Sequence, residues 1–89
     1  MKNIIREEIN RWDPEGLLKI GAPEDEYQFE IDEIAKRITA QMTEDEVIHA
    51  INAVFVEHFA GNIPKRTRQI SRRILNKMRN NDYGTTKPT

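Results

Sequence analysis

The chain reads Trp12-Asp13-Pro14-Glu15-Gly16-Leu17-Leu18-Lys19-Ile20-Gly21-Ala22-Pro23-Glu24-Asp25-Glu26-Tyr27 over the stretch that decides its fold. These sixteen positions hold the only tryptophan, two of the four prolines and two of the four glycines. Proline fixes φ and glycine tolerates positive φ, so this density specifies a shape. We interpret the stretch as a structural corner between two helices, with no catalytic motif in it. The residues that define the corner are Trp12, Asp13, Pro14, Gly16, Gly21, Pro23 and Tyr27.

Within the corner the sequence predicts a short helical turn. Asp13 is a good N-cap residue, and Pro14 suits the first helical position, where a missing N–H costs nothing. Gly21 can adopt the left-handed conformation that ends such a turn. Pro23 is expected to start the next helix in the same way, and Trp12 is expected to plug the core at the corner.

Apolar residues recur at helical spacing on both sides of the corner. Ile5, Ile9 and Trp12 predict a first helix over about residues 3–11. The second helix carries an apolar stripe at i, i+4, i+7 and i+11, formed by Tyr27, Ile31, Ile34 and Ile38. Phe29 falls on the opposite side of this helix. Either the N-terminal segment or the tail of the chain covers it, or it is exposed.

The third helix has the strongest local signal. Thr43 and Glu46 have the spacing of a capping box, and Met42 and Val47 have that of a hydrophobic staple. A broad apolar face follows, and we expect Gly61 to end the helix. The residues of this face are Val47, Ile48, Ile51, Val54, Phe55, His58 and Phe59.

A fourth helix is expected to open at Pro64. Its inner face consists of Ile63, Thr67, Ile70, Ile74 and Met78. The sequence therefore predicts an all-α fold: a compact array of four helices with a short extra helical turn between the first and second. Residues 1–83 form a single helical domain in this interpretation, and residues 84–89 form a flexible C-terminal tail.

Composition excludes several classes of function. The chain has no cysteine, so it can form no disulfide, no thiolate metal site and no cysteine nucleophile. No apolar run is long enough to span a membrane, and we expect a cytoplasmic protein. Only 37% of the residues are hydrophobic. A homodimer, or a partner that covers apolar surface, is compatible with so thin a core.

Charge is divided unevenly along the chain. Residues 1–60 hold six Lys/Arg and fourteen Asp/Glu, whereas residues 61–89 hold eight Lys/Arg and one Asp. The basic stripe of the fourth helix could neutralise phosphates, which makes nucleic-acid binding the alternative function. The candidate residues are Lys65, Arg68, Arg72 and Arg79, flanked by Arg66, Arg73 and Lys77. No aromatic residue interleaves them, and we favour neutralisation by the chain's own Glu26, Glu30 and Glu33.

Catalytic chemistry has little support. Glu46-x-x-His49 matches half of a carboxylate-bridged di-iron site, but the second half is missing. His58 lies on the apolar face and cannot join His49. We therefore expect no catalytic residue, no metal and no cofactor, and we interpret the protein as not an enzyme.

The sequence best supports a protein-interaction module. An acidic patch surrounds Phe29 on the second helix and would suit docking on a basic protein surface. The candidate residues are Asp25, Glu26, Phe29, Glu30, Asp32 and Glu33.

A motif resemblance agrees with this interpretation. Trp12-Asp13-Pro14-x-Gly16-Leu17, Gly21-x-Pro23 and Asp25-Glu26-Tyr27 resemble the YugE-like group of small bacterial proteins, a domain of unknown function found in Bacillus and its relatives. The resemblance implies a small all-α fold in a cytoplasmic bacterial protein and implies no activity. Related patterns in small proteins from toxin–immunity neighbourhoods imply a protein-binding antagonist of inhibitor or immunity type. The basic fourth helix lies outside the motif.

Overall fold

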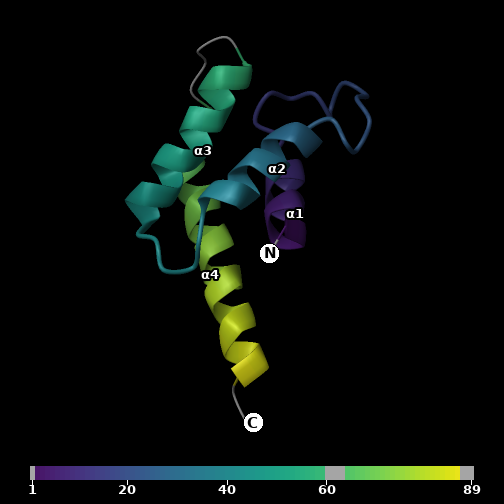
Figure 1. Ribbon diagram of the computed structural model, residues 1–89. Helices are drawn as coiled ribbons and strands as arrows, with labels where there is room; N and C mark the ends of the chain where they lie inside the picture. The colour runs from purple at the N-terminus through teal and green to yellow at the C-terminus, as the bar shows by residue number, and fades with distance from the viewer. Residues whose placement is uncertain (1, 60–63, 87–89) are drawn as a thin grey trace.

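The protein folds into four α-helices (Figure 1). The computed structural model describes residues 2–59 and 64–86, the last six of these by their backbone alone. The helices are α1 (Lys2–Trp12), α2 (Gln28–Arg37), α3 (Glu44–His58) and α4 (Thr67–Thr86). No strand occurs in the described residues, so the prediction of an all-α, four-helix fold is confirmed.

The helices pack in a closed ring. α1 packs against α2 and α4, and α3 packs against the same two helices. Within the described residues α2 makes no contact with α4. Figure 1 shows α4 running past the other helices, so that its C-terminal half projects from the body of the molecule. This projection explains the elongated outline of 44 × 25 × 20 Å.

The core is built from the inward stripes of all four helices. These apolar stripes are withdrawn from water, which is the main force that holds the ring together. Their buried members are Ile5, Ile9, Tyr27, Ile31, Ile34, Ile38, Val47, Ile51, Val54, Phe55, Ile70, Ile74, Leu75 and Met78. The stripes predicted for α2 and α4 are therefore confirmed where the structure describes them, and on α3 the predicted face is confirmed except at Ile48 and His58, which are only half-buried and lie outside the core cluster.

Aromatic rings tie the corner to α3. The ring of Phe55 lies edge-on to Trp12 and to Tyr27, at centroid distances of 5.8 and 6.1 Å, and stacks on Phe59 at 5.6 Å. Trp12 is half-buried against this cluster, and its Nε1 donates a hydrogen bond of 2.9 Å to the carbonyl of Lys65. Trp12 thus joins the end of α1 to the segment that enters α4.

The short helical turn predicted in the corner is absent, and hydrogen-bonded turns take its place. Asp13 has a φ of 48°, whereas an N-cap residue needs extended backbone. Its N–H donates to the carbonyl of Ile9 and so closes α1. Its carboxylate instead accepts from the backbone N–H groups of Leu18 and Lys19, both at 3.1 Å. Gly21, at a φ of 101°, has the positive φ expected of it.

Tyr27 fixes the corner from the other side. Its buried hydroxyl donates to Asp13 Oδ1 at 2.6 Å and accepts from the N–H of Glu15 at 3.1 Å. Burial, together with the adjacent Asp13 carboxylate, raises the pKa of the Tyr27 hydroxyl. The backbone of Tyr27, at φ −95° and ψ 13°, is not α-helical, and α2 begins only at Gln28. The predicted start at Pro23 is therefore wrong, because turns fill the segment between.

The sequence predicts the start of α3 correctly but not the start of α4. The capping box of Thr43 and Glu46 is present and confirms the predicted start of α3. α4 begins at Thr67 rather than at Pro64, because Arg66 has a φ of 65°, which no α-helix accommodates. The predicted contributions of Gly61 and Ile63 lie outside the described residues. α4 continues to Thr86, and the flexible tail from residue 84 onwards stays a prediction.

We expect the substitution Thr43→Ala to lower the free energy of unfolding by about 1 kcal/mol, since it removes the side chain that accepts from the N–H of Glu46. Urea denaturation followed by circular dichroism measures the effect. Thr39→Ala is the matched control, because Thr39 is exposed and lies outside any helix. Equal losses for the two variants would contradict a stabilising role for the cap.

Candidate functional site

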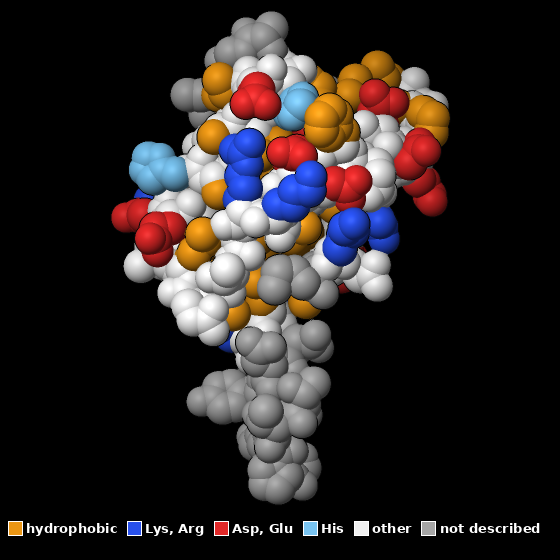
Figure 2. Space-filling view, in the orientation of Figure 1, with side chains coloured by type: hydrophobic (Ala, Val, Ile, Leu, Met, Phe, Trp, Pro, Cys, Tyr) orange, Lys and Arg blue, Asp and Glu red, His pale blue; other side chains and the backbone are white. Residues whose placement is uncertain are grey.

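Phe29 is an exposed aromatic residue at the start of α2. Phe29 is 59% exposed. The centroid of its ring lies 4.5 Å from the centroid of the imidazole ring of His58, at the end of α3. Figure 2 shows a face on which hydrophobic, histidine and acidic side chains lie next to one another, with Lys and Arg side chains alongside. Neither of the segments predicted as a cover for Phe29 buries it within the described residues. We call Phe29, His58 and the neighbouring exposed acids Asp25, Glu26 and Glu57 the Phe29 face.

The six candidate residues of the acidic patch divide into two groups. Asp25 and Glu26 are exposed, and they precede Phe29 by four and three residues. Glu30 is buried, with 6% of its surface accessible. Asp32 pairs with Lys2 at 3.1 Å, and Glu33 pairs with Lys36 at 3.2 Å. The last three residues are therefore buried or neutralised locally, and only Asp25, Glu26 and Phe29 present the surface that the sequence predicts.

The basic residues of α4 are held by other carboxylates of the chain. At the start of α3, Glu44 accepts from Arg68 at 2.6 Å and from Arg72 Nε at 2.9 Å, and Asp45 accepts from Arg68 at 3.1 Å. These hydrogen bonds lower the pKa of Glu44 and raise the pKa of both guanidinium groups. Glu44 also lies in the first turn of α3, where the helix dipole favours negative charge.

A second ion cluster joins α4 to α1 through a buried carboxylate. Glu8 is fully buried; its Oε1 accepts from Arg73 Nε at 2.7 Å, and its Oε2 lies 2.5 Å from Lys77 Nζ. Lys77 also contacts Glu7 at 2.6 Å. Burial alone would raise the pKa of Glu8, but the hydrogen bonds from Arg73 and Lys77 outweigh it, and the pKa is lowered. We call these four residues the Glu8 cluster.

The candidate nucleic-acid residues are mostly engaged inside the molecule. Arg68 and Arg72 pair with Glu44, and Arg79 donates to the carbonyl groups of Ala40 and Met42 at 3.1 and 2.9 Å. Of the four candidates, only the exposed Lys65 has no acceptor for its side chain among the described residues. Arg68 and Arg72 therefore attach α4 to α3, and Arg79 attaches it to the α2–α3 connection. The flanking Arg73 and Lys77 attach it to α1.

Internal neutralisation of α4 involves other partners than the predicted Glu26, Glu30 and Glu33. That prediction is wrong because α2 packs on α1 and α3 rather than on α4: no ion pair joins these three acids to α4 among the described residues, and Glu33 pairs with Lys36 and Arg37 instead. The sequence does contain a signal for the true partner. Ile5, Glu8, Ile9 and Trp12 follow one another at i, i+3, i+4 and i+7, which places a carboxylate on the apolar face of α1. A buried carboxylate at such a position needs a cation, and only α4 is rich in them.

The described residues contain neither a cluster of metal-binding side chains nor a membrane-spanning helix. Glu46 and His49 are both exposed, and Glu46 is used in the capping box. No group of three His, Asp or Glu residues in residues 2–59 and 64–86 is arranged to hold a metal ion. No helix in the same ranges combines the length and the apolarity needed to cross a membrane.

Comparisons with protein-family models, with curated proteins and with solved structures find no match. The likeness to the YugE-like group therefore rests on the corner motif alone and stays a prediction.

We expect Glu8→Gln to lower the free energy of unfolding by about 2 kcal/mol, because two cations lose a charged acceptor inside the fold. Glu7→Gln makes the same chemical change beside the same Lys77, but Glu7 is exposed and should matter much less. Urea denaturation of the two variants makes the comparison. A Glu7 variant as unstable as the Glu8 variant would contradict the importance of burial.

The lowered pKa of Glu8 also predicts a pH dependence. A carboxylate whose folded pKa lies below its unfolded pKa stabilises the fold above the unfolded value, which is 4.5 for Glu. This stability is lost as the pH falls through the folded pKa. The urea midpoint should therefore drop between pH 6 and pH 3, and drop less steeply in Glu8→Gln. Parallel curves for the two proteins would show that Glu8 does not contribute.

Proposed function

We propose that the protein is a non-enzymatic interaction module that binds a basic protein surface through the Phe29 face. One observation carries the proposal: a large aromatic ring stands exposed at the junction of α2 and α3, with carboxylates close to it. An exposed aromatic ring loses contact with water when a partner covers it, and such residues often dominate binding energy.

The acidic rim of the Phe29 face indicates that the partner is positively charged. Asp25 and Glu26 have no ion pair among the described residues, and Glu57 has only a 3.9 Å contact with the histidine. Carboxylates at the rim of an interface steer a positively charged partner and add specificity more than affinity. The complementary surface would therefore have a pocket for the phenyl ring and Lys or Arg around it. An inhibitor or immunity-type protein would use such a face to cover a basic site on its target.

The same balance of charges weakens the nucleic-acid alternative. Arg68, Arg72 and Arg79 would have to leave internal acceptors before they could bind phosphates. The exposed acids near Phe29, in contrast, need no such exchange.

The experiment identifies the partner by photocrosslinking and then measures the affinity of the purified pair. A benzophenone amino acid at position 29 should crosslink one protein that binds the unmodified chain with 1:1 stoichiometry. Phe29→Ala should weaken that complex by at least tenfold, and Asp25→Lys with Glu26→Lys should weaken it and remove most of its salt dependence. Gln69→Ala, an exposed change on α4, is the control and should bind normally.

Two results would overturn the proposal. The first is a partner whose affinity is the same for the wild type and for Phe29→Ala while thermal unfolding shows both proteins folded. The second is a dimer of the chain that dissociates on Phe29→Ala, since a second copy would present the same acidic rim rather than a basic one. Sedimentation velocity of the wild type and the variant detects this dimer.

A further inference from the structure

A small hollow lies where the end of α1 meets the start of α4, and none of the residues of the Phe29 face lines it. It measures about 250 Å³, and arginine side chains from both helices converge on it. We call it the arginine hollow. Its lining consists of Arg11, Trp12, Arg66, Gln69, Ile70 and Arg73.

Two of the three arginines at the arginine hollow form no ion pair among the described residues, although Glu7 on the same helix as Arg11 interacts with it electrostatically. Arg73 belongs to the Glu8 cluster, whose two carboxylates and two cations balance one another. Arg11 and Arg66 have no carboxylate within 4 Å of their guanidinium groups among the described residues, and both side chains are exposed. Arginine stays protonated at any physiological pH. Two unpaired cations are therefore held at the same hollow, which matches the charge of one phosphate dianion.

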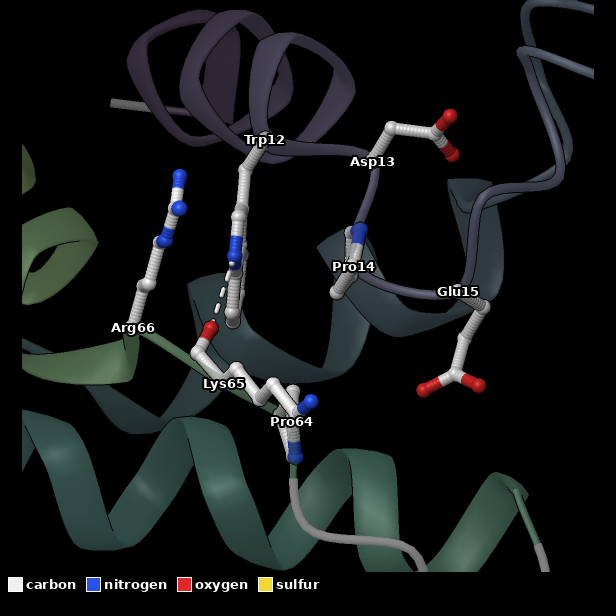
Figure 3. A pocket seen from close by; sticks show the side chains of 7 residues that line it. All are labelled: Trp12, Asp13, Pro14, Glu15, Pro64, Lys65 and Arg66. Carbon is white, nitrogen blue, oxygen red and sulfur yellow. Dashed lines mark hydrogen bonds between the residues drawn. The ribbon is translucent and has the colours of Figure 1, made fainter.

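Trp12 lies between Arg66 and two acids of the corner (Figure 3). Figure 3 shows Arg66 extending beside the indole toward α1, whereas Asp13 and Glu15 lie on the far side of Trp12. The bond from Trp12 Nε1 to the carbonyl of Lys65 fixes the ring next to Arg66. The chain thus keeps its own carboxylates away from Arg66, although they are only a few residues from the hollow.

The backbone also commits Arg66 to this position. Its φ of 65° lies in the left-handed region, which residues with a side chain rarely adopt. Such a conformation persists only where the surroundings hold it, and here the Trp12 hydrogen bond to the preceding residue does so. Arg66 therefore lines the hollow without a carboxylate partner among the described residues.

We propose that the arginine hollow binds a phosphate group. Guanidinium groups present paired N–H donors that match phosphate oxygens, and Gln69 adds a neutral donor at the rim. Trp12 and Ile70 form an apolar part of the lining, which suits a substituent carried by the phosphate. The ligand is either free inorganic phosphate or an organic phosphate monoester, and both share the chemistry that the hollow recognises. This site is independent of the Phe29 face.

The experiment uses the fluorescence of Trp12, the only tryptophan of the chain. Inorganic phosphate, phenyl phosphate and acetate are titrated separately into the intact protein at constant ionic strength. We expect a saturable change with the phosphates and at least tenfold weaker binding of acetate. Phenyl phosphate binding more tightly than inorganic phosphate indicates an organic monoester, and equal binding indicates free phosphate.

Substitutions locate the site. Arg66→Gln and Arg11→Gln should each weaken phosphate binding by at least tenfold, whereas Arg37→Gln removes an exposed arginine on α2, far from the lining of the hollow in sequence, and should leave binding unchanged. Thermal unfolding checks that all three variants are folded. The proposal is overturned by a linear, non-saturating response to phosphate, by equal binding of acetate, or by equal losses in Arg37→Gln and Arg66→Gln.

Discussion

The fold depends on how a strongly basic helix is held against an acidic body. Arg73 and Lys77 of α4 reach a carboxylate, Glu8, that lies on the apolar face of α1 and is fully buried. Withdrawing that carboxylate from water is costly, and only its two cations make the burial tolerable. Arg68 and Arg72 make a second, more exposed attachment to the start of α3. Apolar burial supplies the main driving force, and these two attachments fix where α4 lies between its neighbours.

The sequence predicts the helices well because their signals are local. The apolar stripes, the Thr43 capping box and the order of four helices all follow from spacing within about ten residues. The corner was predicted less well, because its conformation depends on a long-range contact. Asp13 reads as an N-cap, yet its carboxylate serves Leu18, Lys19 and the Tyr27 hydroxyl. These contacts hold residues 14–27 as turns and delay the start of α2.

In the candidate site, too, local features follow from the sequence and long-range contacts do not. The sequence places Phe29 opposite the Tyr27–Ile38 stripe, but only the structure shows that no described segment covers it. The partners of the basic helix do not follow from the sequence, because they depend on which helices are neighbours. In a closed ring α2 and α4 lie opposite each other, so the basic residues of α4 pair with Glu7 and Glu8 of α1 and with Glu44 and Asp45 of α3, whereas Asp25, Glu26 and Glu57 stay exposed. The ring order thus determines which charges a partner can meet.

A double-mutant cycle between Glu8 and Arg73 tests this account most directly. The free energies of unfolding of Glu8→Gln, Arg73→Gln and the double variant are compared with that of the wild type, with the exposed Glu33–Lys36 pair as a reference. The account predicts that the two substitutions are strongly non-additive, with a coupling clearly larger than that of the reference pair. Additive losses would contradict it, because the buried Glu8–Arg73 pair would then contribute nothing to how α4 is held against α1.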